Sequence, residues 1–91
     1  MRLDLFLKAS RLVARRPLVR ELCDAGKILV NDLQGKPAKD VHTGDRIKLI
    51  RPGAVIEVEI AYIPTTKQVS KADAAGLYQT ISEKPLERDL L

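Results

Sequence analysis

The first part of the chain has the hydrophobic periodicity of a helix. Over residues 3–14, apolar side chains recur every three or four positions, which predicts a helix with one buried stripe. Asp4 stands in its first turn, where it caps the helix, interacts favourably with the helix dipole, or pairs with Lys8 one turn later. Leu5 and Leu12 point away from the stripe and are free to contact a second element or a partner. The stripe consists of Leu3, Phe6, Leu7, Ser10 and Val13.

A second helix is predicted over residues 17–25. Pro17 suits its first position, where the missing N–H costs nothing. Gly26 is placed to end it in the left-handed conformation. The two helices are therefore short and are joined by a corner at Arg15 and Arg16.

After residue 27 the periodicity becomes that of strands. Residues 28–30 form a short apolar strand, and residues 31–35 are rich in turn formers. Residues 46–51 and 55–63 alternate polar and apolar side chains and are separated by Pro52-Gly53, which favours a type II turn. We therefore predict a hairpin whose sheet has one face against the helices and one in water.

The last third of the chain predicts a short C-terminal helix. Ser70 is placed to cap it, and residues 84–91 are expected to fray. Its apolar stripe is Ala74, Leu77, Tyr78 and Ile81. The predicted fold class is therefore α+β, with two N-terminal helices packed on a small antiparallel sheet over residues 1–63 and a helical extension over residues 64–91.

The distribution of charge along the chain says more about function than the overall composition does. The chain has 91 residues, enough for one small domain, with 16 basic and 12 acidic side chains and a net charge of +4. Residues 1–27 hold seven basic and three acidic groups, so the whole excess lies there, and residues 28–91 are neutral. This polarity indicates a face suited to a polyanion. Only three aromatic residues are present (Phe6, Tyr62 and Tyr78), so charge rather than base stacking would dominate binding to nucleic acid.

Motifs for catalysis, metal binding or a cofactor are absent from the sequence. It has no phosphate-binding glycine loop, no paired metal ligands and no serine or cysteine triad. Cys23 lies on the helix face expected to be buried and is interpreted as a core residue, and His42 as a solvated loop residue. Neither an apolar run of membrane-spanning length nor a secretory signal is found, and a single cysteine fits a reducing, cytoplasmic location.

An ordered set of short motifs resembles the S4 RNA-binding domain over residues 1–50. The motifs are Arg2-Leu3-Asp4, Phe6-Leu7, Ser10-Arg11-Leu12, Arg15-Arg16, Ala25-Gly26-Lys27-Ile28, Val30-Asn31, Lys36-Pro37 and Val41 through Gly44-Asp45. The hairpin and the tail with Leu77-Tyr78 resemble the small stand-alone bacterial members of this family, of the fifteen-kilodalton heat-shock and ribosome quality-control type. The sequence departs from the family pattern at Asp32, where glycine is usual, and at Pro17 and Leu5. Asp tolerates a left-handed backbone, so we expect the turn at Asp32 to survive.

The resemblance implies a non-enzymatic, ribosome-associated RNA-binding protein. In such proteins the two helices and the following strand form one unit whose exposed face binds structured RNA. The stand-alone members bind the large ribosomal subunit after stalled ribosomes split. There they contact large-subunit ribosomal RNA and hold peptidyl-tRNA while a partner elongation factor adds alanine to the stalled chain. The expected RNA-binding residues are Arg2, Lys8, Arg11, Arg15, Arg16, Arg20, Lys27 and Asn31.

Other functions remain open from the sequence. The expected protein is a monomer without a cofactor and without membrane contact. RNA binding would also serve ribosome assembly or the targeting of RNA modification. A basic protein-interaction module is a further alternative, which Leu5 and Leu12 favour because an apolar pair beside charge can anchor a partner. Asn31 is as well suited to stabilising a turn as to bonding a sugar or base.

Overall fold

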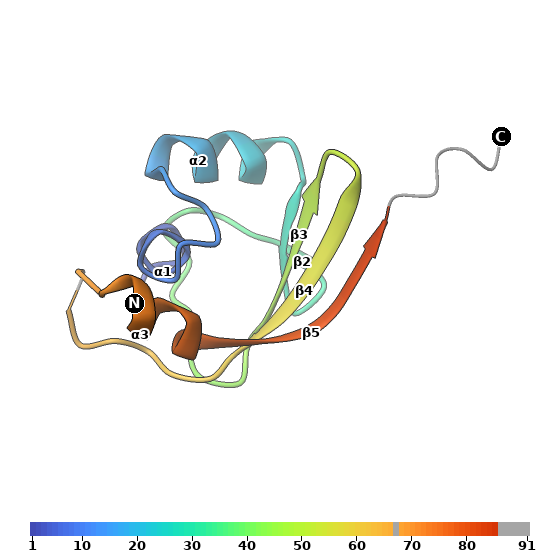
Figure 1. Ribbon diagram of the computed structural model, residues 1–91. Coiled ribbons are helices and arrows are strands. Elements are labelled where there is room, and N and C mark those ends of the chain that lie inside the picture. The colour runs from blue at the N-terminus through green and yellow to red at the C-terminus, as the bar shows by residue number, and fades with distance from the viewer. Residues whose placement is uncertain (67, 86–91) are drawn as a thin grey trace, which may run out of the picture.

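A five-stranded antiparallel sheet with helices along one side forms the protein (Figure 1). The computed structural model describes residues 1–66 and 68–85. The strand order is β2-β1-β3-β4-β5, and every neighbouring pair is antiparallel. The elements are α1 (Leu3–Ala9), α2 (Arg16–Asp24), β1 (Ile28–Val30), β2 (Leu33–Gln34), β3 (Arg46–Arg51), β4 (Ala54–Ile60), α3 (Lys71–Ala74), the 3-10 turn η1 (Ala75–Leu77) and β5 (Tyr78–Pro85). The α+β fold class is confirmed. Among the helices of the described residues, none combines the length and the apolar character of a membrane span.

The core lies between α1 and the inner face of the sheet. All five residues of the predicted stripe are buried, with Leu3, Phe6 and Leu7 fully excluded from solvent. They pack against apolar side chains of β1, β3 and β4. Burying a side chain of this size stabilises the fold by about 1.5–3 kcal/mol. Cys23, on the inner side of α2, is buried in the same cluster as predicted.

Helix α1 ends five residues earlier than its periodicity predicts. The buried Ser10 hydroxyl donates to the Leu7 carbonyl (3.1 Å) and accepts from the Leu12 N–H (3.4 Å), bonds that turn the chain out of the helix. Arg11 follows with a φ of 64°, and its N–H donates to the Lys8 carbonyl (3.1 Å). The prediction of a helix through residue 14 is therefore wrong, and Arg11 lies outside the helix that carries Lys8.

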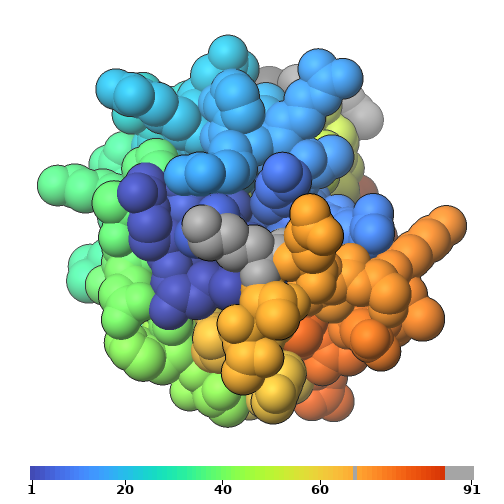
Figure 2. Space-filling view, turned by 90° about the vertical axis from the view of Figure 1, so that its left-hand side faces the viewer, coloured from blue at the N-terminus to red at the C-terminus, as the bar shows by residue number. Residues whose placement is uncertain are grey.

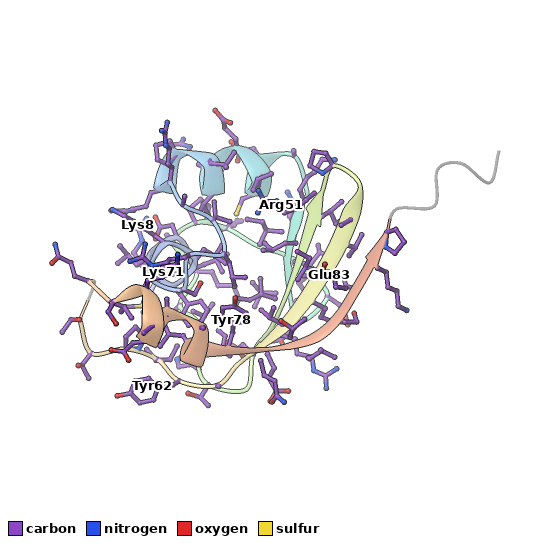
Figure 3. All side chains as sticks on the ribbon, viewed as in Figure 1. Lys8, Arg51, Tyr62, Lys71, Tyr78 and Glu83 are labelled. Atoms are coloured by element: carbon purple, nitrogen blue, oxygen red, sulfur yellow. The ribbon has the colours of Figure 1, made fainter. Side chains whose placement is uncertain are left out.

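Helix α2 matches its prediction to within one residue at each end. Pro17 lies in its first turn, and Gly26 follows it with a φ of 72°. A side chain of β3 holds the corner between the helices, because the Arg51 guanidinium donates to the Leu12 carbonyl (3.1 Å). Arg51 is labelled in Figure 3. The two helices therefore meet through a fixed turn.

The turns of the sheet also follow from local sequence. Asn31 and Asp32 both have positive φ (52° and 68°), the pairing typical of a tight hairpin turn, so the turn with Asp in place of Gly survives as expected. Beyond it, Leu33 and Gln34 form β2 on β1, where only a turn-rich segment was predicted. Gly53 has a φ of 84°, consistent with the predicted type II turn between β3 and β4. Strand β4 ends at Ile60, three residues before the predicted end.

The C-terminal extension contributes a strand as well as a helix. Ser70 caps α3 as predicted, accepting from the Asp73 N–H (3.1 Å), but the helix ends at Ala74. Tyr78 and Ile81, predicted on that helix, lie instead in β5, which pairs along β4. β5 provides hydrogen-bond partners for the N–H and C=O groups along the free edge of β4. Lys84 and Pro85 belong to this strand rather than to a frayed end, and residues 86–91 lie outside the described part. The domain division after residue 63 stays a prediction.

Candidate nucleic-acid interface

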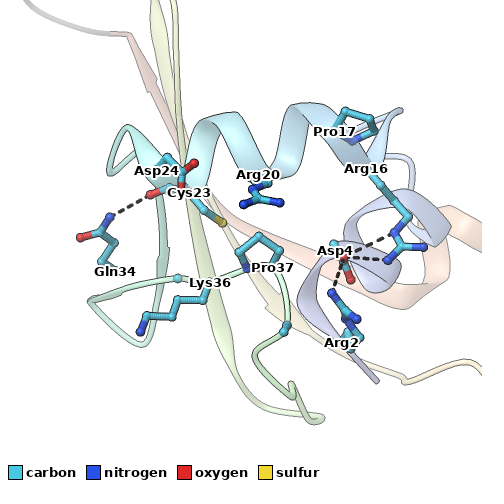
Figure 4. A pocket seen from close by; sticks show the side chains of 12 residues that line it. Arg2, Asp4, Arg16, Pro17, Arg20, Cys23, Asp24, Gln34, Lys36 and Pro37 are labelled. Carbon is cyan, nitrogen blue, oxygen red and sulfur yellow. Dashed lines mark hydrogen bonds and ion pairs between the residues drawn. The ribbon is translucent and has the colours of Figure 1, made fainter.

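A buried carboxylate holds two arginines together at the N-terminal end of α1. Asp4 Oδ2 accepts hydrogen bonds from Arg16 Nη2 (3.0 Å) and Nε (3.3 Å), and from Arg2 Nη2 (3.1 Å; Figure 4). Its other oxygen, Oδ1, accepts from the Leu5 N–H (2.8 Å). The Asp4 side chain is 5% exposed, whereas those of Arg2 and Arg16 are 49% and 44% exposed. The two guanidiniums therefore lie over a buried anion with their outer parts in solvent.

These arginines border a groove between α2 and the segment that follows β2, which we call the arginine groove. Its volume is about 720 Å³, and Arg20 and Lys36 stand along it (Figure 4). Neither Arg20 nor Lys36 forms an ion pair with another described residue. Its lining residues are Arg2, Asp4, Arg16, Pro17, Arg20, Cys23, Asp24, Gln34, Gly35, Lys36, Pro37 and Ala38. The groove thus has four cations and two carboxylates, one of which is already shared between Arg2 and Arg16.

A second hollow, which we call the α1 hollow, lies between α1, the helix corner and the C-terminal extension. Its volume is about 640 Å³. Arg11 crosses toward the extension, where its guanidinium donates to the Val69 carbonyl (3.3 Å). Figure 2 shows this side of the molecule, with the dark-blue start of the chain between α2 and the orange extension. The lining residues are Leu5, Lys8, Ala9, Arg11, Ala14, Arg16, Gln68 and Val69. Since Arg16 borders both the hollow and the arginine groove, the two adjoin.

The structure gathers most of the predicted RNA-binding residues around these two depressions. Arg2, Arg16 and Arg20 border the arginine groove, and Lys8 and Arg11 border the α1 hollow together with Arg16. Arg15, at the exposed corner, precedes α2 directly. Arg15, Lys27 and Asn31 are not among the residues lining either depression.

Asn31 is engaged within the protein. Its Oδ1 accepts from the Arg46 N–H (3.0 Å), and its Nδ2 donates to Asp45 Oδ1 (3.2 Å). These bonds tie the β1–β2 turn to the start of β3. Asn31 therefore stabilises a turn, which was one of its two interpretations from the sequence. An RNA contact by this residue stays a prediction.

The pairing of Asp4 differs from the one expected. The ion pair with Lys8 is not formed, and Asp4 Oδ2 accepts instead from Arg2 and from Arg16, twelve residues away. Its Oδ1 accepts from the Leu5 N–H in the first turn of α1, so the capping interpretation of Asp4 is confirmed. Two of the arginines therefore share one carboxylate. This leaves the cluster of Arg2, Asp4 and Arg16 with a charge of +1, localised on the exposed side.

Two residues of the site were not predicted. Lys36 borders the arginine groove, and the motif Lys36-Pro37 already carried part of the family resemblance, which was the available signal. Asp4 also belongs to a motif of that resemblance, Arg2-Leu3-Asp4, but its contact with Arg16 had no local signal, because its burial and the approach of Arg16 depend on how α2 packs on α1. Cys23 also lines the groove, but it is buried, and burial raises the pKa of its thiol, which disfavours the nucleophilic thiolate. Within residues 1–66 and 68–85, no three His, Cys, Asp or Glu side chains gather as a metal site would require.

Comparison with known proteins places this arrangement in a family. The S4 domain family matches residues 1–47. An RQC P-site tRNA stabilizing factor from Halalkalibacterium halodurans is 39% identical over 97% of this chain and 98% of its own length. One of the same description from Bacillus subtilis is 37% identical over 94% of this chain and 98% of its own. The structure of heat shock protein 15 from Vibrio cholerae, described as trimeric, superimposes with a TM-score of 0.80 at 29% identity, covering 90% of this chain and 82% of that one.

The matched region contains α1, α2, β1 and β2, the elements that carry the arginine groove. The relatives match over nearly their whole length, so the C-terminal extension belongs to the shared chain. The protein therefore belongs to the S4 domain family, among its small members that include the RQC P-site tRNA stabilizing factors and heat shock protein 15.

Proposed function

We propose that this protein binds structured RNA through the arginine groove and the α1 hollow, and that it does so as a ribosome-associated quality-control factor. One observation carries the proposal: Arg2 and Arg16 are held side by side by a buried carboxylate at a groove that also presents Arg20 and Lys36. The names of the relatives, RQC P-site tRNA stabilizing factor, support the biological setting.

The chemistry of these side chains suits an RNA backbone. A guanidinium is planar and its N–H groups match phosphate oxygens in pairs. Folded RNA is recognised mainly through its shape, its phosphates and its 2′-hydroxyls, which requires charge and hydrogen-bond donors rather than aromatic platforms. If about five phosphates are neutralised, the logarithm of affinity falls with the logarithm of salt concentration with a slope of about −4.

In its finer form, the proposal places the protein on the split large subunit. There it contacts large-subunit ribosomal RNA and holds peptidyl-tRNA while a partner elongation factor extends the stalled chain with alanine. The protein itself acts by binding and positioning, without a catalytic centre, in the cytoplasm. The predicted residues Arg2, Lys8, Arg11, Arg15, Arg16, Arg20 and Lys27 would supply the contacts to phosphate, together with Lys36.

Sedimentation with purified large subunits tests this proposal. The wild-type chain should pellet with subunits that carry peptidyl-tRNA and less with empty ones. The double variant Arg20→Glu/Lys36→Glu should remain in the supernatant, because it replaces two cations of the groove with anions and leaves the Asp4 cluster intact. Lys84→Glu is the single-site control, since Lys84 is exposed on β5, at the opposite edge of the sheet from the arginine groove (Figure 1).

The outcomes separate the alternatives. Full retention of the double variant on subunits would contradict RNA binding through the arginine groove. Equal binding of the wild type to empty and to tRNA-occupied subunits would favour a role in ribosome assembly. Release by the double variant, with retention of Lys84→Glu, supports the proposal.

A further inference from the structure

Of the two acidic side chains that line the arginine groove, Asp4 is buried, whereas Asp24 is exposed. A carboxylate opposes the approach of a polyanion, so on charge alone its presence weakens RNA binding. Its contacts suggest a different effect. Oδ1 is fixed by the Leu5 N–H (2.8 Å), so the carboxyl plane is set by the helix backbone. Oδ2 then receives both arginines within 3.3 Å.

The contacts leave most of each guanidinium available. Arg16 uses its Nε–H and one Nη2 hydrogen, and Arg2 uses one Nη2 hydrogen. A guanidinium has five N–H donors, so most donors of both side chains remain for a ligand. Since Arg2 and Arg16 are nearly half exposed, those donors face the groove and the solvent rather than the core.

We propose that Asp4 is a positioning residue for RNA: it orients Arg2 and Arg16 in the unbound protein so that both guanidiniums meet the same stretch of phosphate backbone. The inference rests on the proposed RNA-binding function. A free arginine side chain loses conformational entropy when it binds, and a side chain ordered beforehand loses less. Asp4 thus weakens the long-range attraction of the surface for RNA but arranges Arg2 and Arg16 in advance for binding phosphate.

The sign of one substitution distinguishes positioning from simple charge. Asp4→Asn keeps the shape and the acceptor for the Leu5 N–H but raises the net charge from +4 to +5. If charge alone matters, affinity for large subunits carrying peptidyl-tRNA rises. If Asp4 positions the arginines, affinity falls about tenfold, the size expected when one charge-assisted hydrogen-bonded arrangement is lost. Glu21→Gln is the matched control, because Glu21 is exposed on α2 and gives the same change in charge. It should leave affinity unchanged or slightly raised.

A second pair of variants keeps the net charge constant and the buried carboxylate in place. Arg16→Lys retains the cation, but an ammonium does not reproduce the contact of Nε and Nη2 with one oxygen. Arg20→Lys is its control, since Arg20 lines the same groove without contacting Asp4. Arg16→Lys should weaken binding several-fold more than Arg20→Lys. Arg16 and Arg20 are exposed, so their replacement by lysine should not prevent folding. These two variants therefore test the positioning role even if Asp4→Asn does not fold.

The order of the Arg16 side chain can be measured in the unbound, folded protein, separately from RNA affinity. In ¹⁵N NMR of arginine side chains, the Arg16 Nε–H should be protected from exchange with water and ordered in the wild type, and both properties should disappear in folded Asp4→Asn. In Asp4→Asn, the logarithm of affinity should also fall less steeply with the logarithm of salt concentration. Loss of one phosphate contact reduces this slope by about 0.7–0.9.

Failure of this inference differs from failure of the proposed function. If the wild type does not bind the subunits, RNA binding itself is wrong. If the wild type binds and folded Asp4→Asn binds as tightly as Glu21→Gln, or Arg16→Lys equals Arg20→Lys, the positioning role is refuted and RNA binding stands. Weakened binding by Asp4→Asn and Arg16→Lys against their controls, with a mobile Arg16 side chain in the former, supports it.

Discussion

The backbone conformation at the end of α1 determines whether glycine or alanine is the more stable residue at position 11. Arg11 follows this helix with a φ of 64°, a conformation that costs a residue with a Cβ about 1–2 kcal/mol and costs glycine little. Comparing Gly with Ala at this position removes the arginine side chain in both variants, so only the Cβ differs. Glycine is more flexible when unfolded, which offsets part of the gain. We therefore expect Arg11→Gly to be more stable than Arg11→Ala by about 1 kcal/mol.

Lys8 supplies the matched control inside the helix. It is an exposed residue of α1, three positions earlier, where alanine is favoured over glycine by about 0.8–1.0 kcal/mol. The Gly–Ala difference should therefore change sign between positions 8 and 11. If α1 instead continued through residue 14, as its periodicity predicts, alanine would be the more stable residue at both positions.

Urea denaturation followed by far-UV circular dichroism measures these differences. In a domain of this size, 1 kcal/mol corresponds to a change of about 4–8 °C in Tm, so thermal melts provide a second measurement. An Arg11→Ala variant as stable as Arg11→Gly, or more so, would refute the left-handed end of α1. Arg11 would then lie in the same helix as Lys8.

Three further predictions concern stability and pH. Ser10→Ala removes a buried hydroxyl with two backbone partners and should lower the free energy of unfolding by about 1 kcal/mol in urea denaturation. Gly35→Ala should lower it by about 1–3 kcal/mol in the same assay, because the new Cβ would lie 3.1 Å from a Leu3 side-chain carbon and 3.3 Å from the Ile28 carbonyl oxygen. The N-terminal ammonium donates to Asp40 (2.8 Å) and lowers the pKa of that carboxyl. The stabilising contribution of Asp40 is therefore complete above the ordinary carboxyl pKa of about 4 and is lost as the pH falls through the folded value. Asp40→Asn should accordingly flatten the acid side of a plot of unfolding free energy against pH, and an unchanged slope would contradict the ion pair.

Local patterns predicted the parts of the fold that depend on neighbouring residues. The buried face of α1 followed from the spacing of Leu3, Phe6 and Leu7, because side chains three and four apart share one side of a helix. The bounds of α2 followed from Pro17, whose ring fixes its own φ, and from Gly26, which adopts the positive φ that ends the helix without a steric penalty. The concentration of positive charge in residues 1–27 likewise indicated which elements would form the basic surface, although Lys36 joins it from outside that segment.

Features that depend on distant partners did not follow from local pattern. Tyr78 and Ile81 have spacing that suits a helix, but the open edge of β4, about twenty residues earlier, provides hydrogen-bond partners that a short exposed helix does not. The Ser10 hydroxyl bonds to nearby backbone groups of Leu7 and Leu12, but its burial depends on tertiary packing, and burial removes the water that would compete for those bonds.

The amino-acid sequence was enough to establish the fold class, the two helices, the β3–β4 hairpin and the segment that carries the charge. The arrangement of that charge depends on tertiary packing. Asp4 and Arg16 are twelve residues apart, and they meet because α2 packs on α1 and removes the Asp4 carboxylate from water. A carboxylate in solvent would attract its neighbours weakly and without fixed geometry, whereas a buried one requires hydrogen-bond donors and holds them in place. The basic surface therefore owes its charge to local sequence and its geometry to the packing of two helices.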